Sequence, residues 1–562
     1  MNQAGRDRLA LVLVLELVLE LELVLELVLE LVLELVLELV LELVLELELV
    51  LVLAFVLAFV LVLALALALI LARPVKVFWY GPSSVHPVYG GGVHDGLTIL
   101  TDRLFDGAAI RHEPLEVQAR AGVIERVVPL GGGSRPAGPV LDARGALLLP
   151  GLINTHVHVA RGGMFEPKEP IGVRQVVKNL RGALAAGVTT IGDMGCAAEL
   201  IRALRAHVAA SPSSGPSILA SGPLITAPRG YPLDWMPPLL RRMGVVLGCG
   251  DECAARRAVA HVAAAGMDHI KIAVMHRSYA DRPLDALTEP VALAVVAEAH
   301  RLGLRVLAHA HGVDDYRVAL AAGVDALMHS SFEPLDEVMV ARVRDAGVPV
   351  CPTLWVFEST CLGAELRWDG DPRYVRHVTP PIARSWRRFA EAWAVSGDIV
   401  PEGIAGGAPK ERAREAIRIA AANLRLLRDA GVPIAFGNDA AYGFSLLARP
   451  VDELGAMQRA GMSAVECLRA ATKTAAELLA RPDRGVIAPG KRADLVVVDA
   501  AAEHDVTAIE QVRAVVVGGR IIDTAAAPGA LAAARTTLAF AGGLLHTAAA
   551  GAVYLARGDD RR

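Results

Sequence analysis

The sequence is poor in cysteine and in aromatic residues, and it has no excess of positive charge. Its six cysteines are scattered over 562 residues without a Cys-x2-Cys pair, which in a chain of this size indicates reduced, mostly structural thiols. Aromatic residues make up 4% of the chain, and no basic stretch is interleaved with them. Because nucleic-acid binding needs such basic surfaces, we expect no nucleic-acid partner.

Negative charge is concentrated at the N-terminus. Residues 1–72 hold 11 of the 61 acidic residues and two of the 56 basic ones, so the rest of the chain is close to neutral. From Leu11 to Val50 a Leu-Val-Leu-Glu unit repeats with small slips. As a helix this repeat would place a drifting Glu stripe on an apolar rod, and as a strand it would place Leu on one face. The periodicity does not choose between the two.

Residues 50–72 form a run of 23 residues without a charge, followed by Arg73. This length suits a membrane-spanning helix. Arg6 and Arg8 resemble the basic start of a signal peptide, although ten Glu residues intervene before the apolar run. A true start downstream is a third interpretation. We therefore expect a protein that is cytoplasmic or associated with a membrane through residues 50–72.

The body of the chain alternates between short apolar runs and Ala-rich helical stretches. Its length allows two or three domains. Eight β/α alternations within residues 151–480 predict an α/β fold, a (β/α)8 TIM barrel. The expected strands are Leu147–Ile153, Thr189–Asp193, Ser217–Ala220, His269–Val274, Arg305–Ala308, Ala326–Met328, Val348–Cys351 and Pro433–Phe436.

Helices are expected between these strands and after them. The long connection before Pro433 is expected to hold extra helices, and Ser463 with Glu466 forms a capping box that predicts a helix start. Residues 84–150 and 481–525 are expected to form a small β-sandwich built from both chain ends, and residues 526–562 are an Ala-rich tail. The expected helices are Val291–Arg301, Asp314–Ala322, Leu335–Asp345, Glu411–Asp429 and Ser463–Ala480.

Ionisable residues follow the C-terminal ends of the predicted barrel strands, where barrel enzymes carry out their chemistry. Each one alone has an ordinary explanation: Lys271 could extend along apolar surface, and Asp439 could cap a helix. Their joint placement indicates a metal site, because imidazole and carboxylate are the ligands that suit Zn2+. The six residues are His156, His158, Lys271, His309, His329 and Asp439.

With these residues the chain resembles the amidohydrolase superfamily, especially its branch of imidazolonepropionase-related enzymes and metal-dependent Xaa-Pro dipeptidases (prolidases). The resemblance runs from Gly96 to Asp523. Its motifs are Pro150-Gly-Leu-Ile-Asn-Thr-His-Val-His158, Ile270-Lys271-Ile272, Val306-Leu-Ala-His-Ala-His-Gly312, His329, Gly437-Asn-Asp-Ala440 and Gly485-Val-Ile-Ala-Pro-Gly-Lys-Arg-Ala-Asp-Leu495.

The resemblance implies a site for one or two divalent metals, such as Zn2+. His156, His158 and Asp439 would bind the first metal, and His309 and His329 would complete the second. Lys271, carboxylated on its amine, would bridge the two. A metal-activated hydroxide would attack an amide-type carbonyl, and Asp439 would act as base and then as acid.

Two further residues are candidates for substrate binding. Tyr231 lies in the loop after the third predicted strand, where some relatives carry His, and loop packing is the alternative. His311 follows His309 by two residues. We expect His311 to point away from His309 if the strand continues, and to orient the substrate or only to pack.

The sequence thus predicts an enzyme that cleaves a C–N bond of a dipeptide or an N-acyl amino acid. One alternative is a cyclic amide or amidine hydrolase or a deaminase, although deaminases of this superfamily lack the bridging lysine. Another is a catalytically inactive, membrane-tethered binding protein, which an intact ligand set disfavours. A small-molecule or dipeptide substrate and a homo-oligomeric assembly are the expected partners.

Overall fold

The computed structural model describes residues 96–524, apart from 134, 161–172, 235, 237–240, 242–243, 278–281, 365–367, 369, 397–409 and 441–443, together with residue 542. The chain divides into two units, Met1–Gly91 and Gly92–Arg562. The N-terminal repeat, the apolar run 50–72 and the tail 526–562 except residue 542 lie outside the described residues. Within the described part, no helix is both long and apolar enough to cross a membrane.

Two of the β-sheets contain antiparallel pairs, and one of these sheets joins the two ends of the body. Its strand β7 pairs with β17 from Leu495↔Pro150 to Asp499↔Ala146. The four-stranded sheet has the order β5-β4-β1-β6, and the six-stranded sheet the order β19-β18-β17-β7-β2-β3. The strands are β1 (Gly96–Thr101), β2 (Leu104–Phe105), β3 (Ile110–Arg111), β4 (Leu115–Arg120), β5 (Val123–Pro129), β6 (Val140–Asp142), β7 (Ala146–Pro150), β17 (Leu495–Asp499), β18 (Val512–Val517) and β19 (Arg520–Ile521).

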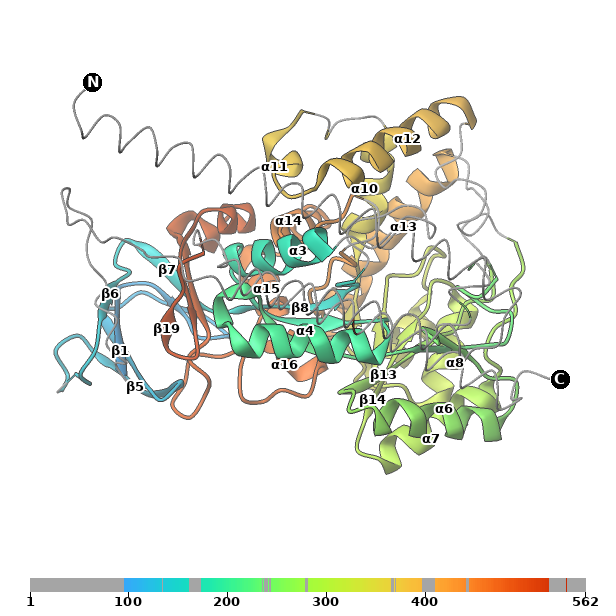
Figure 1. Ribbon diagram of the computed structural model, residues 1–562, viewed down its shortest axis with the longest axis horizontal. Helices are drawn as coiled ribbons and strands as arrows, with labels where there is room; N and C mark the ends of the chain where they lie inside the picture. Colours follow the sequence, from blue (N-terminus) through green and yellow to red (C-terminus); the bar gives the residue numbers. More distant parts are fainter. Residues whose placement is uncertain are drawn as a thin grey trace, which may run out of the picture. The chain divides into compact units, whose positions relative to one another are not determined.

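The two sheets share one apolar core. Leu97 and Ile99, which project from the same face of β1, are buried in one cluster with Leu148 of β7 and Val497 of β17. Side chains two residues apart on a strand share a face, so this spacing directs β1 toward the second sheet. Figure 1 shows β1, β5, β6, β7 and β19 gathered at one end of the body.

The remaining strands are parallel and form two sheets, β10-β9-β8 and β12-β11-β13-β14-β15-β16. Their short apolar sequences are buried almost throughout, which is typical of parallel strands covered on both faces. Helices precede and follow them in the chain. The strands are β8 (Leu152–Val157), β9 (Val188–Asp193), β10 (Ser217–Ala220), β11 (Leu224–Thr226), β12 (Val246–Gly248), β13 (His269–Ala273), β14 (Arg305–His309), β15 (Ala326–Met328) and β16 (Val350–Cys351).

Residues 433–440 lie between the two parallel sheets. Ile434 forms a parallel bridge with Val350 of β16, and Ala440 forms one with Val157 of β8. The amide of Thr155 also donates to the carbonyl of Phe436 at 3.0 Å. The first and last parts of the α/β region are therefore hydrogen-bonded to each other.

The helices follow the strands in alternation, and the predicted extra helices α10 to α13 are present between β16 and residue 433. Figure 1 shows α10, α12 and α13 close together, in agreement with their packing contacts. The helices are α3 (Val173–Ala185), α4 (Ala198–Ala210), α6 (Glu252–Ala264), α7 (Glu289–Arg301), α8 (Val313–Ala322), α9 (Glu337–Asp345), α10 (Leu354–Ala364), α11 (Pro372–Val375), α12 (Pro380–Ser396), α13 (Lys410–Asp429), α14 (Pro450–Arg459), α15 (Ala464–Ala470) and α16 (Lys473–Leu478), with 3-10 turns η1 (Pro212–Ser214), η2 (Ala500–Glu503) and η3 (Val506–Glu510).

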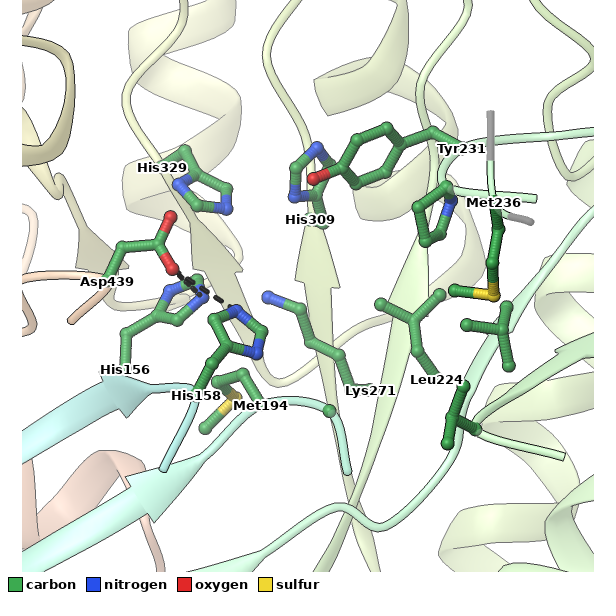
Figure 2. A pocket seen from close by; sticks show the side chains of 14 residues that line it. His156, His158, Met194, Leu224, Tyr231, Met236, Lys271, His309, His329 and Asp439 are labelled. Carbon is green, nitrogen blue, oxygen red and sulfur yellow. Dashed lines mark ion pairs between the residues drawn. The ribbon is translucent and has the colours of Figure 1, made fainter. Parts of the chain in front are cut away.

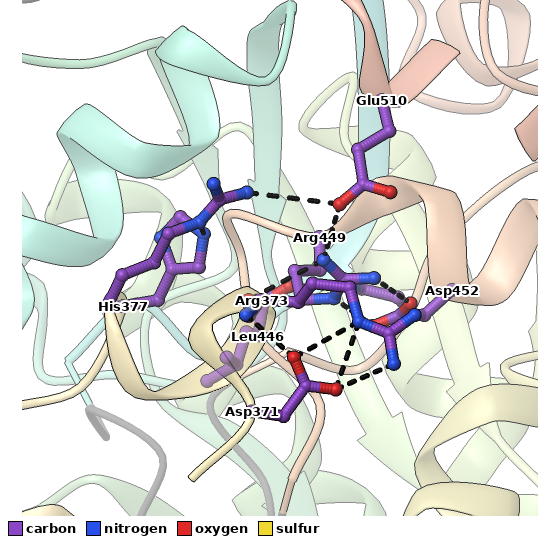
Figure 3. A network of polar contacts seen from close by, with 9 residues as sticks. Asp371, Arg373, His377, Leu446, Arg449, Asp452 and Glu510 are labelled. Atoms are coloured by element: carbon purple, nitrogen blue, oxygen red, sulfur yellow. Dashed lines mark hydrogen bonds and ion pairs between the residues drawn. The ribbon is translucent and has the colours of Figure 1, made fainter. Parts of the chain in front are cut away.

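A buried arginine connects three of these elements (Figure 3). Arg449, which precedes α14 and is 4% exposed, pairs with Asp452 at 2.7 Å and with Glu510 of η3 at 2.7 Å. Its guanidinium also lies 4.7 Å from the ring centre of Tyr374 in α11. One cation thus holds α11 and η3 against the start of α14.

Two predicted elements are divided in the structure. The expected strand Leu147–Ile153 is two strands, because Gly151 ends β7 in one sheet and β8 begins the parallel sheet at Leu152. The expected helix Ser463–Ala480 begins at the predicted capping box but is interrupted at residues 471–472. There the carbonyl of Ala471 accepts from the amide of Ile153, and the carbonyl of Ala470 accepts from the amide of Phe436. These bonds replace helical hydrogen bonds at the end of α15.

The eighth predicted strand, Pro433–Phe436, is also corrected. Only Ile434 forms a β-bridge there: the amides of Val350 and Ala435 make the two bonds of the bridge, but the next amide, that of Phe436, donates to the carbonyl of Ala470 instead. Strands β11 and β12, of three residues each, were not predicted.

Candidate active site

The six predicted ligand residues converge on one cavity of about 50 Å3 (Figure 2). His156 lies in β8 and His158 just after it, Lys271 is in the middle of β13, and His309 ends β14. His329 follows β15, and Asp439 lies in the bridging segment 433–440. Because the parallel strands end at the same edge of their sheets, residues far apart in sequence meet here.

His156, His158 and Asp439 form the first group of candidate metal ligands. The Oδ1 atom of Asp439 is 3.5 Å from Nε2 of His156 and 3.2 Å from Nε2 of His158. Atoms that share a tetrahedral ion with bonds of about 2.1 Å are roughly 3.4 Å apart. The spacing of this group therefore fits ligands around a common ion.

His309, His311 and His329 form a second group, whose candidate ligand atoms lie within 4.8 Å of one another. The rings of His309 and His311 are 4.4 Å apart, and those of His311 and His329 are also 4.4 Å apart. The prediction that His311 points away from His309 is therefore wrong. Side chains at positions i and i+2 of an extended chain project to the same side, and the two rings lie together although β14 itself ends at His309.

Lys271 is 1% exposed, and its side chain extends into the cavity between the two groups (Figure 2). Its Nζ atom has no hydrogen-bond partner among the described residues. Burial lowers the pKa of Lys271 to about 7. Since the neutral amine is the form that reacts as a nucleophile, this environment favours modification of Nζ.

The buried imidazoles are in the form that binds metals. Burial lowers the pKa of His156, His309 and His329 well below the usual value, so they are neutral at neutral pH. Within the described part of the chain, Nε2 of His309 and Nε2 of His329 have no hydrogen-bond partner. Buried polar atoms normally have one. Divalent metal ions would satisfy these atoms, so the donor set fits the metals that the sequence implies.

An amide pair holds Asp439 against β8. The Nδ2 of Asn154 donates to Oδ1 of Asn438 at 2.7 Å, and Nδ2 of Asn438 donates to the carbonyl of Leu446 at 3.0 Å. Gly437 permits this close approach, because a Cβ there would lie 2.6 Å from Sγ of Cys351 and 2.7 Å from Cβ of His156. These contacts fix the carboxylate opposite the two histidines.

Backbone strain is present at the site. His329, Thr353 and Asp439 have φ angles of 82°, 48° and 49°, in the left-handed region that residues other than glycine seldom adopt. The Nδ1 of His329 lies 2.7 Å from Oγ1 of Thr353, which orients the ring and leaves Nε2 for the cavity. Such conformations persist where the surrounding structure holds them, and they are common at functional sites.

Sequence reasoning missed a contact beside His311. The carboxylate of Asp315 accepts from the backbone amides of His311 and Gly312 at 3.0 and 2.8 Å, and it lies 2.6 Å from Nδ1 of His276. The hydrogen bond to Asp315 raises the pKa of His276. This pair ties the loop after β13 to the loop that carries His311, and no motif in the sequence indicated it.

Tyr231 also lines the cavity. Its ring stacks on that of His309, with centres 4.6 Å apart and planes 20° apart. The aromatic face of the tyrosine therefore covers His309, a candidate ligand of the second group.

Comparison with known proteins agrees with this geometry. Residues 147–522 match the sequence profile described as the amidohydrolase family. An uncharacterized protein of Mycobacterium tuberculosis (strain H37Rv) is 27% identical over 346 residues, which are 60% of this chain and 76% of that protein. The imidazolonepropionase of Paracoccus denitrificans is 38% identical over 104 residues, which are 17% of this chain and 25% of that enzyme.

Among solved structures, a Xaa-Pro dipeptidase with bound methionine in its active site aligns with a TM-score of 0.62. It is 22% identical, and the alignment covers 76% of this chain and all of that one. This similarity supports a TIM-barrel-like α/β fold. The family profile covers more than half of the chain. This match disfavours the alternative of a catalytically inactive binding protein. The chain belongs to the amidohydrolase family, and it is an enzyme that hydrolyses C–N bonds.

Proposed function

We propose that the protein is a metal-dependent hydrolase that cleaves the amide-type C–N bond of an N-acyl amino acid or a dipeptide. The observation that carries the proposal is the meeting of His156, His158 and Asp439 with His309, His329 and Lys271 in one buried cavity. His156, His309 and His329 are neutral at neutral pH, and Nε2 of His309 and Nε2 of His329 have no hydrogen-bond partner among the described residues. A purely structural cluster would leave these polar atoms unsatisfied.

In this proposal His156, His158 and Asp439 hold one divalent ion, and His309 and His329 hold a second. The amine of Lys271 carries a carboxylate that bridges the two groups, because its position between them suits an anion better than an ammonium. Bound metals such as Zn2+ would polarise a carbonyl and lower the pKa of water from 15.7 to roughly 7.

The protein's own residues position and transfer the proton. Asp439 accepts a proton at its carboxylate and delivers it to the leaving amine, which it can do from the edge of the cavity, where it is 8% exposed. Tyr231 and His311 contact the substrate beside the second group. Asn154 and Asn438 keep the carboxylate of Asp439 in place.

The scaffold that we propose is a closed (β/α)8 barrel with a β-sandwich from both chain ends. The bridges of residues 434 and 440 to β16 and β8 support closure. The core shared by Leu97, Leu148 and Val497 supports the sandwich.

The test uses the full chain purified with Zn2+ and bicarbonate. It is assayed for release of an amino acid from N-acyl amino acids and Xaa-Pro dipeptides and for ring opening of cyclic amides, before and after chelation. We expect hydrolysis of one of the first two classes, loss on chelation and recovery with Zn2+. Full turnover by metal-free protein would contradict the proposal. Preference for cyclic amides would favour the second candidate, which the partial similarity to imidazolonepropionase supports.

A further inference from the structure

One side of the cavity is formed by apolar side chains from three neighbouring segments. Leu224 begins β11, two residues come from the loop after β11, and two lie in or beside β12. Leu224, Met236 and Val246 are 8% exposed or less. We call this surface the apolar wall; it consists of Leu224, Pro232, Met236, Val245 and Val246.

Backbone hydrogen bonds and packing hold the apolar wall in place. Leu224 pairs with Val246 in the parallel register of β11 and β12, and its amide donates to the carbonyl of Val245 at 3.2 Å. The amide of Met236 donates to the carbonyl of Pro232 at 3.1 Å. Leu233 and Ala273 belong to the same apolar cluster as Leu224, Met236 and Val246. The apolar wall is therefore a supported surface.

The apolar wall and the proposed proton-transfer residue lie on opposite sides of the cavity. Figure 2 shows Asp439 beside His156 at one side, Leu224 and Met236 at the other, and Lys271 between them. If Asp439 delivers a proton to the leaving amine, the amine half of the substrate lies on its side. The two substituents of an amide carbonyl point in divergent directions, so the acyl substituent extends toward the apolar wall.

We propose that the apolar wall binds the acyl chain of the substrate and that the substrate is an N-acyl amino acid with an uncharged, apolar acyl group. The inference rests on the proposed function and narrows it. A dipeptide would instead bring an α-ammonium group next to the scissile carbonyl and against the apolar wall, where it would lose hydration and meet no hydrogen-bonding side chain of the wall itself. Each methylene that the apolar wall covers should raise kcat/KM about fourfold.

The first experiment compares hexanoyl-alanine with norleucyl-alanine, which have the same carbon skeleton and differ in the α-ammonium group. The full, Zn2+-loaded chain should hydrolyse hexanoyl-alanine at least roughly tenfold faster in kcat/KM. Across acetyl-, butanoyl-, hexanoyl- and octanoyl-alanine, kcat/KM should rise until the apolar wall is covered. Equal rates for the matched pair, or a flat acyl series, would overturn the proposal.

A pair of variants locates the effect on the apolar wall. Val246→Ala enlarges the cavity and should move the optimum to a longer acyl chain. Val262→Ala is the matched control, because Val262 is a fully buried valine of α6 that does not line the cavity. It should leave the optimum unchanged even if it lowers stability. An equal shift in both variants, or in neither, contradicts the assignment.

The binding of hydroxamates tests the apolar wall independently of whether the protein hydrolyses N-acyl amino acids. Acetohydroxamate and octanohydroxamate share a metal-binding head and differ in chain length, and their affinity for the Zn2+-loaded chain is measured by calorimetry. Tighter binding of octanohydroxamate, weakened in Val246→Ala, supports the apolar wall even if no acyl-alanine is hydrolysed, in which case the proposed function fails alone. Equal affinities overturn the apolar wall as an acyl site.

Discussion

Asp439 combines a left-handed backbone with contacts to two histidines. We expect Asp439→Asn to lower kcat by about 10²–10⁴-fold, because an amide cannot carry the proton to the leaving amine. The fold should persist, since Asn tolerates a positive φ. Steady-state kinetics and thermal melts check this result against Asp429→Asn at the end of α13. Turnover near that of the parent would exclude proton transfer by Asp439.

Lys271 is the residue that we propose bridges the two groups of metal ligands. Lys271→Met keeps the length of the side chain but cannot form a bridging carboxylate. We expect about one bound ion per chain in place of about two after purification with Zn2+ and bicarbonate. The metal-free variant should melt at a higher temperature, because an apolar side chain replaces an amine without a partner. Elemental analysis that finds no change in metal content would rule out the bridge.

The candidate ligands could be predicted from sequence because each lies within or just after an apolar strand-like run in a recognisable motif. The predicted orientation of His311 was wrong, because side chains two residues apart on an extended chain lie on the same side, as was expected of His156 and His158. The contacts of Asn154 with Asn438 and of His276 with Asp315 join residues from distant segments. Nothing local to either partner reveals such pairs.

Among the structural elements, Glu116 of β4 secures the loop between β5 and β6. Its carboxylate accepts from Arg135 at 2.6 Å and from the amide of Gly131 at 3.0 Å. The hydrogen bond from Arg135 lowers the pKa of Glu116 from 4.5 to about 2. A lowered folded-state pKa stabilises the protein above pH 4.5, and this contribution is lost as the pH falls from 4.5 toward 2.

Glu116→Gln should therefore reduce the free energy of unfolding by about 1–2 kcal/mol at neutral pH, a value discounted because Arg135 is partly exposed. The difference from the parent should shrink as the pH is lowered to about 3. Urea unfolding over this range measures it. A difference that is constant with pH would show that the carboxylate charge is not the cause.

The contacts of Arg449 attach α11 and η3 to the start of α14 (Figure 3). Arg449→Met leaves Asp452, which is 8% exposed, without its cation. We expect a loss of about 3 kcal/mol in the free energy of unfolding. The double variant Arg449→Met with Asp452→Leu should recover part of that loss. Additive losses in the double variant would show that the two side chains are not coupled.

Element types were predicted where a periodic pattern continued, as in β13, β14, α7, α8 and α13. The failures occur where a neighbouring segment decides the structure. Gly151 divides an apolar run because its two halves pair in different sheets, and α15 ends because strand amides bond to its last carbonyls. β11, which was not predicted, and β15, which was, both have three residues, so strand length alone does not decide whether a strand can be predicted.

For the whole molecule, we expect residues 1–72 to be dispensable for catalysis. All the candidate ligands lie between His156 and Asp439, and the described sheets begin at Gly96. A chain that starts at Arg73 should bind metal and keep the kcat and KM of the full chain. Parallel assays and elemental analysis of both proteins check this. A shortened chain that folds and holds metal but is inactive would reveal a role for the N-terminal segment.

The pairing of early and late strands has a consequence for synthesis on the ribosome. β7 cannot pair with β17, and β8 cannot bond to residues 433–440, until those later segments have been synthesised. The Thr155 hydroxyl, for example, donates to a carbonyl 281 residues further along the chain. Although β7 also pairs with β2 and β8 with β9, each of these apolar strands keeps one edge unpaired through most of translation, a state prone to aggregation. His156 and His158 can contact Asp439 only after residues 433–440 have been synthesised. Loading of the first ion would therefore mark the completion of folding, and newly made apoprotein would depend on chaperones until then.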